Sequence, residues 1–294
     1  MSGQVVALSR INAQLQQLIE QHFPAVKTAG FHLSPVAGLT GESWKIVSPA
    51  GDMLARHQSS DRRNSGVERQ REHAILRHIA RQSLGPYVRL RSPPWLLVEW
   101  IAGTPLSEAA FASAAGQKAV SQSLVKLHQL ALSGYPLDLH RQFARYWQYI
   151  DRRRLTPHWL ALHQKMMRRK LPVPLNMALL HMDIHAGNLL NTEKGMRIID
   201  WEYAADGDTA LEIAALIRGN GLDPHQQEAF IREYAEAGGY RDLSLLRQQV
   251  KRWLPWVDYL MLMWFEVRWA QTADKKYSEW AQPLRVRLFG RVHD

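Results

Sequence analysis

The pattern of apolar residues changes once along the 294-residue chain, near residues 99–103, and this change limits the folds that the chain can adopt. Before the change, short apolar runs between turn residues are typical of strands, at residues 32–36, 43–47, 53–58 and 95–101. One helical pattern lies among them, at residues 67–82. After the change, the pattern favours long helices, at residues 107–133, 139–170, 224–237 and 243–272. We therefore expect an α+β fold with a small sheet lobe followed by a larger, mainly helical lobe.

The distribution of charge narrows the classes of function. The chain has 37 Lys and Arg against 27 Asp and Glu, a formal net charge of +10, which suits a polyanionic partner such as nucleic acid. Residues 181–240, however, carry eleven carboxylates and four basic side chains, a net charge of −7 in an otherwise basic chain. Clustered carboxylates attract cations and metal ions. The charge therefore points to local chemistry in this segment more than to a nucleic-acid partner.

Cysteine content and hydropathy limit the cellular location and the kinds of site that the protein can have. With no Cys, the chain has no disulfide framework, no thiolate nucleophile and no Cys-based metal site. The first residues lack the continuous apolar stretch of a signal peptide, and no 18-residue apolar run follows. We expect a cytoplasmic protein with no membrane partner and no obligate protein partner.

The acidic segment contains a spaced set of chemically active residues. Asp183 and Asn188 lie five residues apart in His181-Met182-Asp183-Ile184-His185-Ala186-Gly187-Asn188, and Asp200 follows the apolar pair at residues 198–199. Phosphoryl transfer needs a group that orients or deprotonates the attacking hydroxyl, and oxygen ligands that hold Mg²⁺ against nucleotide phosphates. An Asp-x4-Asn pair followed by a second Asp supplies that set. A single His such as His185 favours a local hydrogen bond over catalysis.

These motifs resemble the catalytic and metal-binding loops of the protein-kinase-like phosphotransferases, in the branch of aminoglycoside and choline kinases. The resemblance implies a bilobal fold with a small antiparallel sheet, and ATP and Mg²⁺ as cofactors. Asp183 would act on the acceptor hydroxyl, and Asn188 and Asp200 would bind Mg²⁺. His181 and Gly187 would have structural roles in the first loop. Asp208 would brace the chain after the metal-binding Asp200.

The same resemblance places the nucleotide phosphates against the N-terminal lobe. The loop containing Gly38, Gly41 and Ser43 would approach them, because glycine lets the backbone come close to a ligand. The third strand should carry a phosphate-pairing Lys, but this chain has Arg56 there. Arg is always cationic and can bind phosphate oxygens with two donors, so the role survives the replacement.

The rest of the nucleotide site follows from the resemblance. Glu72 is the expected ion-pair partner of Arg56, with Glu68 as the alternative. Backbone groups from Glu99 to Ile101 would meet the adenine. The expected organisation is an N-terminal nucleotide-binding lobe at residues 1–98, a hinge at 99–103 and a catalytic and substrate-binding lobe at 104–294.

The C-terminal segment bears on the acceptor. Five of the 11 Trp lie in the last 42 residues, and their spacings place some of them in the core. Asp258 and Glu266 lie among these apolar residues, and an aromatic surface with a carboxylate suits an organic cation. Several C-terminal stretches, among them residues 181–190, 199–215 and 251–274, are similar to the bacterial thiamine kinase group. That similarity implies phosphorylation of the hydroxyethyl group of thiamine, a small cationic alcohol, with Glu202, Trp264 and Glu266 as candidate substrate contacts.

Three other functions remain open. The same fold could phosphorylate choline, another amino-alcohol or an aminoglycoside, although a polycationic antibiotic favours spaced carboxylates over a Trp-rich wall. A nucleic-acid-binding protein would use Arg152-Arg153-Arg154 and Arg168-Arg169-Lys170, but a solvated helix face explains these clusters better. A catalytically silent module is disfavoured by Asp183, Asn188 and Asp200, and is kept open by Arg56.

Overall fold

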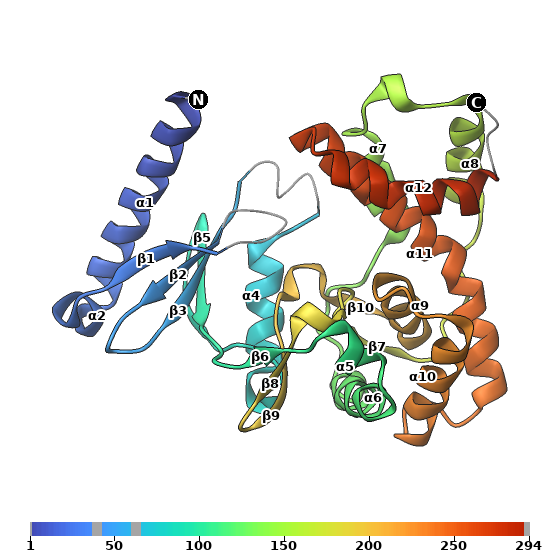
Figure 1. Cartoon of the computed structure of the whole chain (residues 1–294), viewed down its shortest axis with the longest axis horizontal. Coiled ribbons are helices and arrows are strands. Elements are labelled where there is room, and N and C mark those ends of the chain that lie inside the picture. The colour runs from blue at the N-terminus through green and yellow to red at the C-terminus, as the bar shows by residue number, and fades with distance from the viewer. Residues whose placement is uncertain (1, 37–42, 60–65, 291–294) are drawn as a thin grey trace. The chain divides into compact units, whose positions relative to one another are not determined.

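The computed structural model describes residues 2–36, 43–59 and 66–290, with the side chains of residues 2–9 left aside. Two compact units share the chain: residues 1–59 with 86–102, and residues 60–85 with 103–294 (Figure 1). Each unit is discontinuous in sequence. The expected lobes, at residues 1–98 and 104–294, stay a prediction, and the grouping by contacts places residues 66–85 with the second unit.

The first unit is a five-stranded antiparallel sheet with two helices. Its strands lie in the order β1-β2-β3-β5-β4, and every neighbouring pair is antiparallel. The strands are β1 (His32–Pro35), β2 (Ser43–Val47), β3 (Met53–His57), β4 (Val88–Ser92) and β5 (Trp95–Glu99). Helices α1 (Ser2–His22) and α2 (Pro24–Ala29) precede them. The expected small antiparallel sheet is therefore confirmed, with β4 as a strand that the sequence analysis did not anticipate.

The core of the first unit lies between α1, α2 and one face of the sheet. Strand residues alternate between the two faces of a sheet, so one set of alternate side chains can meet the helices. The contacting apolar residues are Leu15, Leu18, Ile19, Val26, Trp44, Ile46, Met53, Ala55, Trp95 and Leu97. Trp44 and Trp95 meet edge to face, with ring centroids 5.4 Å apart.

The second unit is mainly helical, and local capping explains where its helices begin. From α5 onward, each α-helix starts after a Ser, Thr or Asp whose side chain accepts a hydrogen bond from a backbone N–H of the first turn. These caps are Ser107, Ser113, Asp138, Thr156, Asp208, Asp223, Asp242 and Asp274. The helices are α5 (Glu108–Ala112), α6 (Ala114–His128), α7 (Leu139–Trp147), α8 (Pro157–Arg168), α9 (Thr209–Gly219), α10 (Pro224–Glu236), α11 (Leu243–Thr272) and α12 (Lys275–Phe289).

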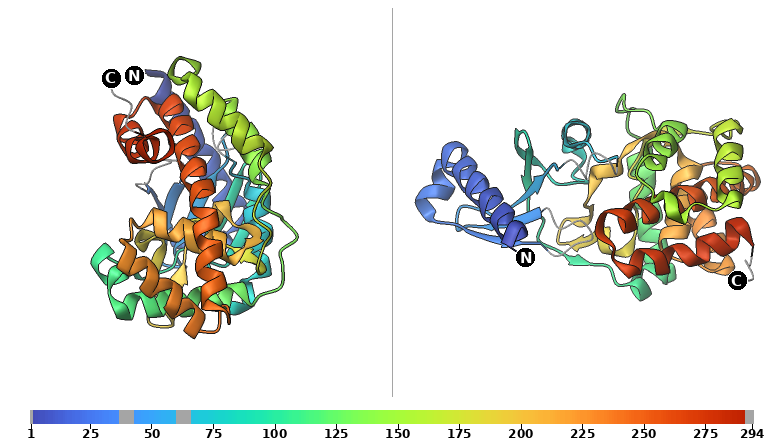
Figure 2. Two further views of the ribbon diagram at one scale, coloured as in Figure 1. Left: turned by 90° about the vertical axis from the view of Figure 1, so that its right-hand side faces the viewer. Right: turned by 90° about the horizontal axis from the view of Figure 1, so that it is seen from above.

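Two of the long helices expected from the sequence are broken. The segment 139–170 forms α7, which ends at Trp147, a short 3-10 turn η2 (Arg152–Arg154) and α8. Pro157 lacks the N–H that a helix interior needs, and it begins α8 after the Thr156 cap. Residues 107–133 likewise divide at Ser113 into α5 and α6. Helix α11 has the expected bounds, and Trp253 and Trp256 on it are buried. It is the long orange-red helix in Figure 2, and it packs against α7, α9, α10 and α12.

Short strands of the second unit bring two loops together. Strand β7 (Met177–Leu180) pairs with β10 (Ala205–Asp208), and β8 (Leu189–Thr192) lies between β6 (Thr104–Pro105) and β9 (Gly195–Ile198). One loop follows β7 and contains the turn η3 (Ala186–Asn188), and the other joins β9 to β10 and contains η4 (Trp201–Tyr203). Helix α4 (Arg69–His78), followed by the turn η1 (Ala80–Gln82), packs against η4.

Across residues 2–36, 43–59 and 66–290, no helix combines the length and the hydropathy that crossing a membrane requires.

A buried ion-pair cluster joins the C-terminal helices. Glu266 on α11 has 1% of its surface exposed, and it accepts hydrogen bonds from Arg154 of η2 at 2.6 and 3.0 Å. Arg285 of α12 donates to the same carboxylate at 2.5 Å. The guanidinium of Arg154 also lies 4.2 Å from the ring centroid of Trp269. Three helical segments therefore share one carboxylate.

We expect Glu266→Gln to lower the free energy of unfolding by about 2 kcal/mol, because it leaves two partly buried guanidinium groups without a negative partner. Urea denaturation followed by circular dichroism measures this change. Glu279→Gln, at an exposed position on α12, is the control and should change stability by less than about 0.5 kcal/mol. Equal stability of the two variants would contradict the role given to Glu266.

Candidate active site

The loop after β7 begins at His181 and is held by a buried carboxylate. Glu212 on α9 is 1% exposed, and its oxygens accept the backbone N–H of His181 at 2.9 and 3.1 Å and that of Met182 at 2.6 Å. His128 on α6 donates to the same carboxylate from Nε2 at 2.8 Å. These hydrogen bonds lower the pKa of Glu212 although burial opposes the shift. Met182 has a left-handed backbone with φ of 66°, a conformation that the surrounding hydrogen bonds must support.

His181 joins this loop to the loop after β9. Its imidazole is fully buried, accepts the Asp183 N–H at Nδ1 at 3.3 Å and donates from Nε2 to the carbonyl of Ile199 at 3.0 Å. Burial lowers the pKa of His181, which keeps the ring neutral with the proton on Nε2. The backbone N–H of Ile199 in turn donates to the Asn188 carbonyl at 2.9 Å. The two loops are therefore one hydrogen-bonded structure, and His181 braces it.

Asn188 orients the carboxylate of Asp183. Its amide Nδ2 donates to the Asp183 backbone carbonyl at 2.9 Å and to Asp183 Oδ2 at 3.0 Å. Because the amide nitrogen makes these hydrogen bonds, the amide oxygen of Asn188 can act as a metal ligand. Burial, together with the nearby Asp200 and Glu202 carboxylates, raises the pKa of Asp183 to about 8, and the Asn188 hydrogen bond opposes that shift.

The donor set around Asp183 fits a magnesium ion. Mg²⁺ binds oxygen ligands, commonly one or two carboxylates together with substrate phosphates and water. Asp200 lies close enough to raise the pKa of Asp183 by repulsion, and a divalent cation would relieve this crowding of negative charge. Asp200 is also held in the left-handed conformation, with φ of 67°. Within the described ranges, no cluster of three or more His, Asp or Glu side chains has the geometry of a metal site built by the protein alone.

Helix α4 is tied to the loop that contains Asp200. Arg69 binds Glu72 one turn later on α4 and also donates to Glu202 at 3.2 Å, and all three side chains are buried. Arg71 donates to the Glu202 carbonyl at 3.1 Å. Glu202, a candidate substrate contact, therefore faces an arginine of its own unit.

The other residues predicted to bind the nucleotide lie in the first unit or outside the described residues. Ser43 on β2 pairs in register with Arg56 on β3, and Arg56 is buried. Glu99 ends β5, and its carboxylate accepts the Tyr87 N–H at 3.1 Å, with Ile101 two residues on. Gly38 and Gly41 fall outside the described residues. A pairing of Arg56 with Glu72 would be a contact between the two units, and it stays a prediction. Within its own unit, Glu72 binds Arg69.

Aromatic residues adjoin the loop on the α11 side. Trp264 Nε1 donates to the hydroxyl of Tyr203 at 2.8 Å. Burial and the neighbouring Glu202 raise the pKa of Tyr203, and the Asp183 carboxylate contributes to this shift, so the phenol lies within electrostatic reach of Asp183. Trp264 belongs to a partly exposed aromatic cluster, and its members are Trp264, Phe265, Tyr277 and Trp280. Glu266, the other acidic candidate, has both oxygens bound by arginines.

Several carboxylates of the acidic segment have structural partners. Asp208 caps α9, and one of its oxygens accepts Gln249 Nε2 at 2.8 Å and Trp253 Nε1 at 2.7 Å. Asp206 accepts the backbone N–H groups of residues 133, 134 and 135 at 2.7–3.1 Å. The sequence analysis did not single out Glu212, although a charged residue inside the apolar run of α9 is a signal that could have indicated it.

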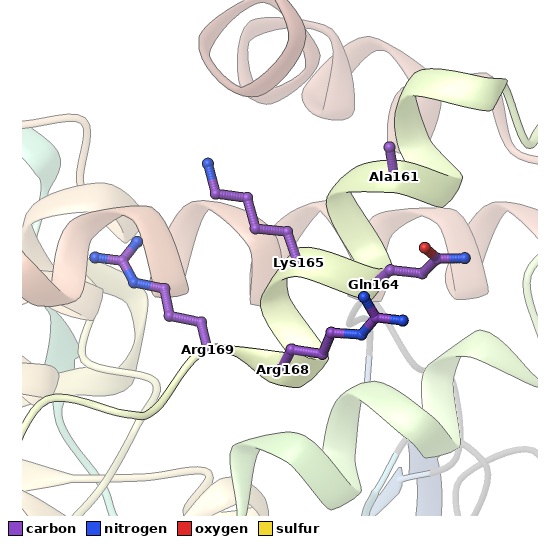
Figure 3. A pocket seen from close by; sticks show the side chains of 5 residues that line it. All are labelled: Ala161, Gln164, Lys165, Arg168 and Arg169. Carbon is purple, nitrogen blue, oxygen red and sulfur yellow. The ribbon is translucent and has the colours of Figure 1, made fainter.

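The two basic clusters have different neighbours: Arg154 of the first binds Glu266, and the second lies at the end of α8. A hollow of about 490 Å³ is lined by Ala161, Gln164, Lys165, Arg168 and Arg169 (Figure 3). Lys165 and Arg169 extend to one side of α8, while Arg168 and Gln164 extend to the other. Cations in the last turn of a helix stabilise its unpaired carbonyl groups. This geometry agrees with a solvated helix end better than with a convergent anion site.

The order of a small antiparallel sheet unit and a helical unit is a kinase-like fold. The choline kinase LicA from Streptococcus pneumoniae superposes with a TM-score of 0.75 at 14% identity, over 95% of this chain and 100% of that chain. A second structure, LicA in complex with AMP, has a TM-score of 0.71 and covers 87% of this chain and 90% of that one, again at 14% identity. The bilobal, kinase-like fold class expected from the sequence is confirmed.

The chain belongs to the phosphotransferase enzyme family, whose profile matches residues 32–247. It is 32% identical to a thiamine kinase of Salmonella typhi over 262 residues, 89% of this chain and 90% of the relative. It is 33% identical to a thiamine kinase of Shigella boydii serotype 4 over 265 residues, with the same coverage. The resemblance to thiamine kinases within the small-molecule kinase branch is therefore confirmed.

The hydrogen bonds of Glu212 predict a dependence of stability on pH. Its pKa is lower in the folded chain than the ordinary value of 4.5, so the unfolded chain binds a proton first as the pH falls through that value. The stabilisation is present above that pH and is lost below it. We expect Glu212→Gln to lower the free energy of unfolding by about 2 kcal/mol at pH 7, and by less at about pH 4.

Urea denaturation at several pH values measures this difference. Glu236→Gln is the matched control, because that side chain is 64% exposed and faces Arg232 at 4.0 Å. A Glu212→Gln effect that stays constant between about pH 7 and about pH 4 would show that the carboxylate charge is not what holds the loop.

Proposed function

We propose that the chain is an ATP-dependent kinase that transfers the γ-phosphoryl group to the hydroxyethyl group of thiamine, forming thiamine monophosphate and ADP. One observation carries the reaction type: Asp183 is held by the Asn188 amide in a loop that His181 ties to the Asp200 loop. A base for the acceptor hydroxyl and two candidate Mg²⁺ ligands are thereby held in one rigid structure. Identity of 32–33% to thiamine kinases over 89% of the chain supports the choice of acceptor.

Asp183 would accept the proton of the acceptor hydroxyl as that oxygen attacks the γ-phosphorus. The Asn188 amide nitrogen fixes the position of Oδ2, at 3.0 Å. Asp200 and the amide oxygen of Asn188 would hold Mg²⁺, which neutralises charge on the nucleotide phosphates when bound. Arg56 on β3 would bind phosphate oxygens, together with the loop of Gly38, Gly41 and Ser43. Backbone groups from Glu99 to Ile101 would meet the adenine.

The neighbourhood of Asp183 suits a cationic alcohol. Tyr203 lies within electrostatic reach of Asp183, Trp264 donates a hydrogen bond to its hydroxyl, and Glu202 adds a carboxylate close to Asp183. A thiazolium ring gains about 0.5–2 kcal/mol from contact with an aromatic face. Trp264 is therefore the strongest of the three candidates for an acceptor contact, because Glu202 is buried against Arg69 and the charge of Glu266 is compensated by Arg154 and Arg285.

ADP release with ATP, Mg²⁺ and one acceptor at a time tests this proposal. We expect turnover with thiamine that exceeds turnover with choline, ethanolamine or kanamycin. Asp183→Asn should lower kcat by about 10²–10⁴-fold with a small change in KM, because it removes proton acceptance and keeps the shape. Turnover with choline or kanamycin but not thiamine would exclude the proposed acceptor.

The proposed role of Asp200 as a metal ligand predicts a change in the Mg²⁺ requirement. Asp200→Asn should raise the Mg²⁺ concentration needed for half-maximal ADP release by at least about tenfold, because it removes one of the charged oxygen ligands. Chelation of the metal should abolish turnover of the wild-type protein. Asp274→Asn is the control, since Asp274 caps α12 and Asn caps equally well. An unchanged Mg²⁺ requirement in Asp200→Asn would remove Asp200 from the metal site.

A further inference from the structure

His185 lies in the catalytic loop, between Asp183 and Asn188, and its ring orientation is set by the backbone. The residue precedes the turn η3, and its Nδ1 accepts the N–H of Gly187 at 3.1 Å. A Cβ on residue 187 would lie 3.1 Å from Cε1 and 3.2 Å from Nδ1 of this ring. Gly187 therefore leaves room for the imidazole to lie close against the turn.

This contact determines which nitrogen carries the proton. A nitrogen that accepts a hydrogen bond is unprotonated, so Nε2 carries the hydrogen of the neutral ring. Burial lowers the pKa of His185, which agrees with a neutral ring. The side chain thus presents an N–H donor whose position depends on a local backbone contact.

The donor lies beside the catalytic carboxylate without bonding to it. His185 Nε2 is 3.9 Å from Asp183 Oδ2, which exceeds the length of a hydrogen bond. The histidine side chain is 40% exposed and that of Asp183 37%, so both are open to a substrate. In the proposed reaction, the groups that would approach Asp183 are the acceptor hydroxyl and the phosphoryl oxygens, and ionised phosphoryl oxygens accept hydrogen bonds without donating them.

We propose that His185 is a further catalytic residue whose Nε2–H donates a hydrogen bond to a non-bridging oxygen of the phosphoryl group during transfer. The proposal rests on the proposed function as a kinase. In the step, the acceptor oxygen forms a bond to the γ-phosphorus, and the bond from this phosphorus to the β,γ-bridging oxygen breaks. That oxygen leaves on ADP with the electron pair, and the hydroxyl proton passes to Asp183. A fixed donor at the migrating group stabilises its charge where it develops.

Two substitutions separate this role from that of a loop cap. The Asn side chain can place its amide oxygen near the position of Nδ1, so His185→Asn keeps an acceptor for the Gly187 N–H and removes the distal donor. The longer Gln side chain can place its amide nitrogen near the position of Nε2, so His185→Gln keeps the distal donor. A loop cap predicts that Asn is the better replacement, and a phosphoryl donor predicts Gln.

The measurement is ADP release with thiamine, giving kcat and KM for both substrates, with thermal unfolding as the folding control. We expect His185→Asn to lower kcat by about 10²-fold with KM values within about threefold, and His185→Gln to lose less than about tenfold. An Asn variant that keeps kcat within about twofold of wild type, or a Gln variant that loses as much as Asn, overturns the proposal.

Transfer to water distinguishes failure of this proposal from failure of the proposed acceptor. ADP release with ATP and Mg²⁺ but no acceptor uses the same phosphoryl group and the same donor. If thiamine fails as acceptor, the proposed function is wrong, and the two variants are compared in this slower reaction. A similar rate for wild type and His185→Asn there overturns the role of His185, and a lower rate in Asn than in Gln supports it.

Discussion

The buried carboxylate of Glu212 is the interaction on which the geometry of the site depends. It accepts two successive backbone N–H groups of the loop after β7 and a further hydrogen bond from His128. A buried charge is costly unless it is paired and hydrogen-bonded, so the loop, α9 and α6 must keep these positions together. The left-handed turn at Met182 and the direction of Asp183 follow from this anchor.

The carboxylates of the acidic segment fall into two groups, those that hold the fold together and those at the candidate active site. The carboxylate oxygens of Asp206, Asp208 and Glu212 accept hydrogen bonds from backbone N–H groups and side-chain donors. The Asp183 carboxylate accepts a hydrogen bond from Asn188, and its pKa is raised by burial and by the carboxylates around it. Carboxylates crowded together in this way favour a cation among them. The negative charge of the segment therefore builds the loops at Asp206, Asp208 and Glu212, and around Asp183 it has the sign that the proposed metal ion and cationic acceptor require.

Sequence reasoning succeeded where the relevant contacts are short in sequence. Asp183 and Asn188 bond to each other across five residues, and His185 and Gly187 across two, so their spacing alone predicts their proximity. The bounds of α11 agree with its pattern for the same reason, since helix periodicity is local. Pro157 is a local signal of the same kind, since proline suits the first turn of a helix and not its interior, and α8 begins there within the range 139–170.

The spacing of Asp183, Asn188 and Asp200, the change from strands to helices and the family of the chain can all be read from the amino-acid sequence alone. Tertiary structure decided which charged residues are paired. Glu266 is bound by Arg154 from 112 residues away, Glu202 by Arg69 from 133 residues away, and Glu212 reaches His128 across 84 residues. A periodic pattern places a residue on a face of its own helix but contains no information about which distant side chain meets it. The roles of these carboxylates therefore depended on packing that only the folded chain defines.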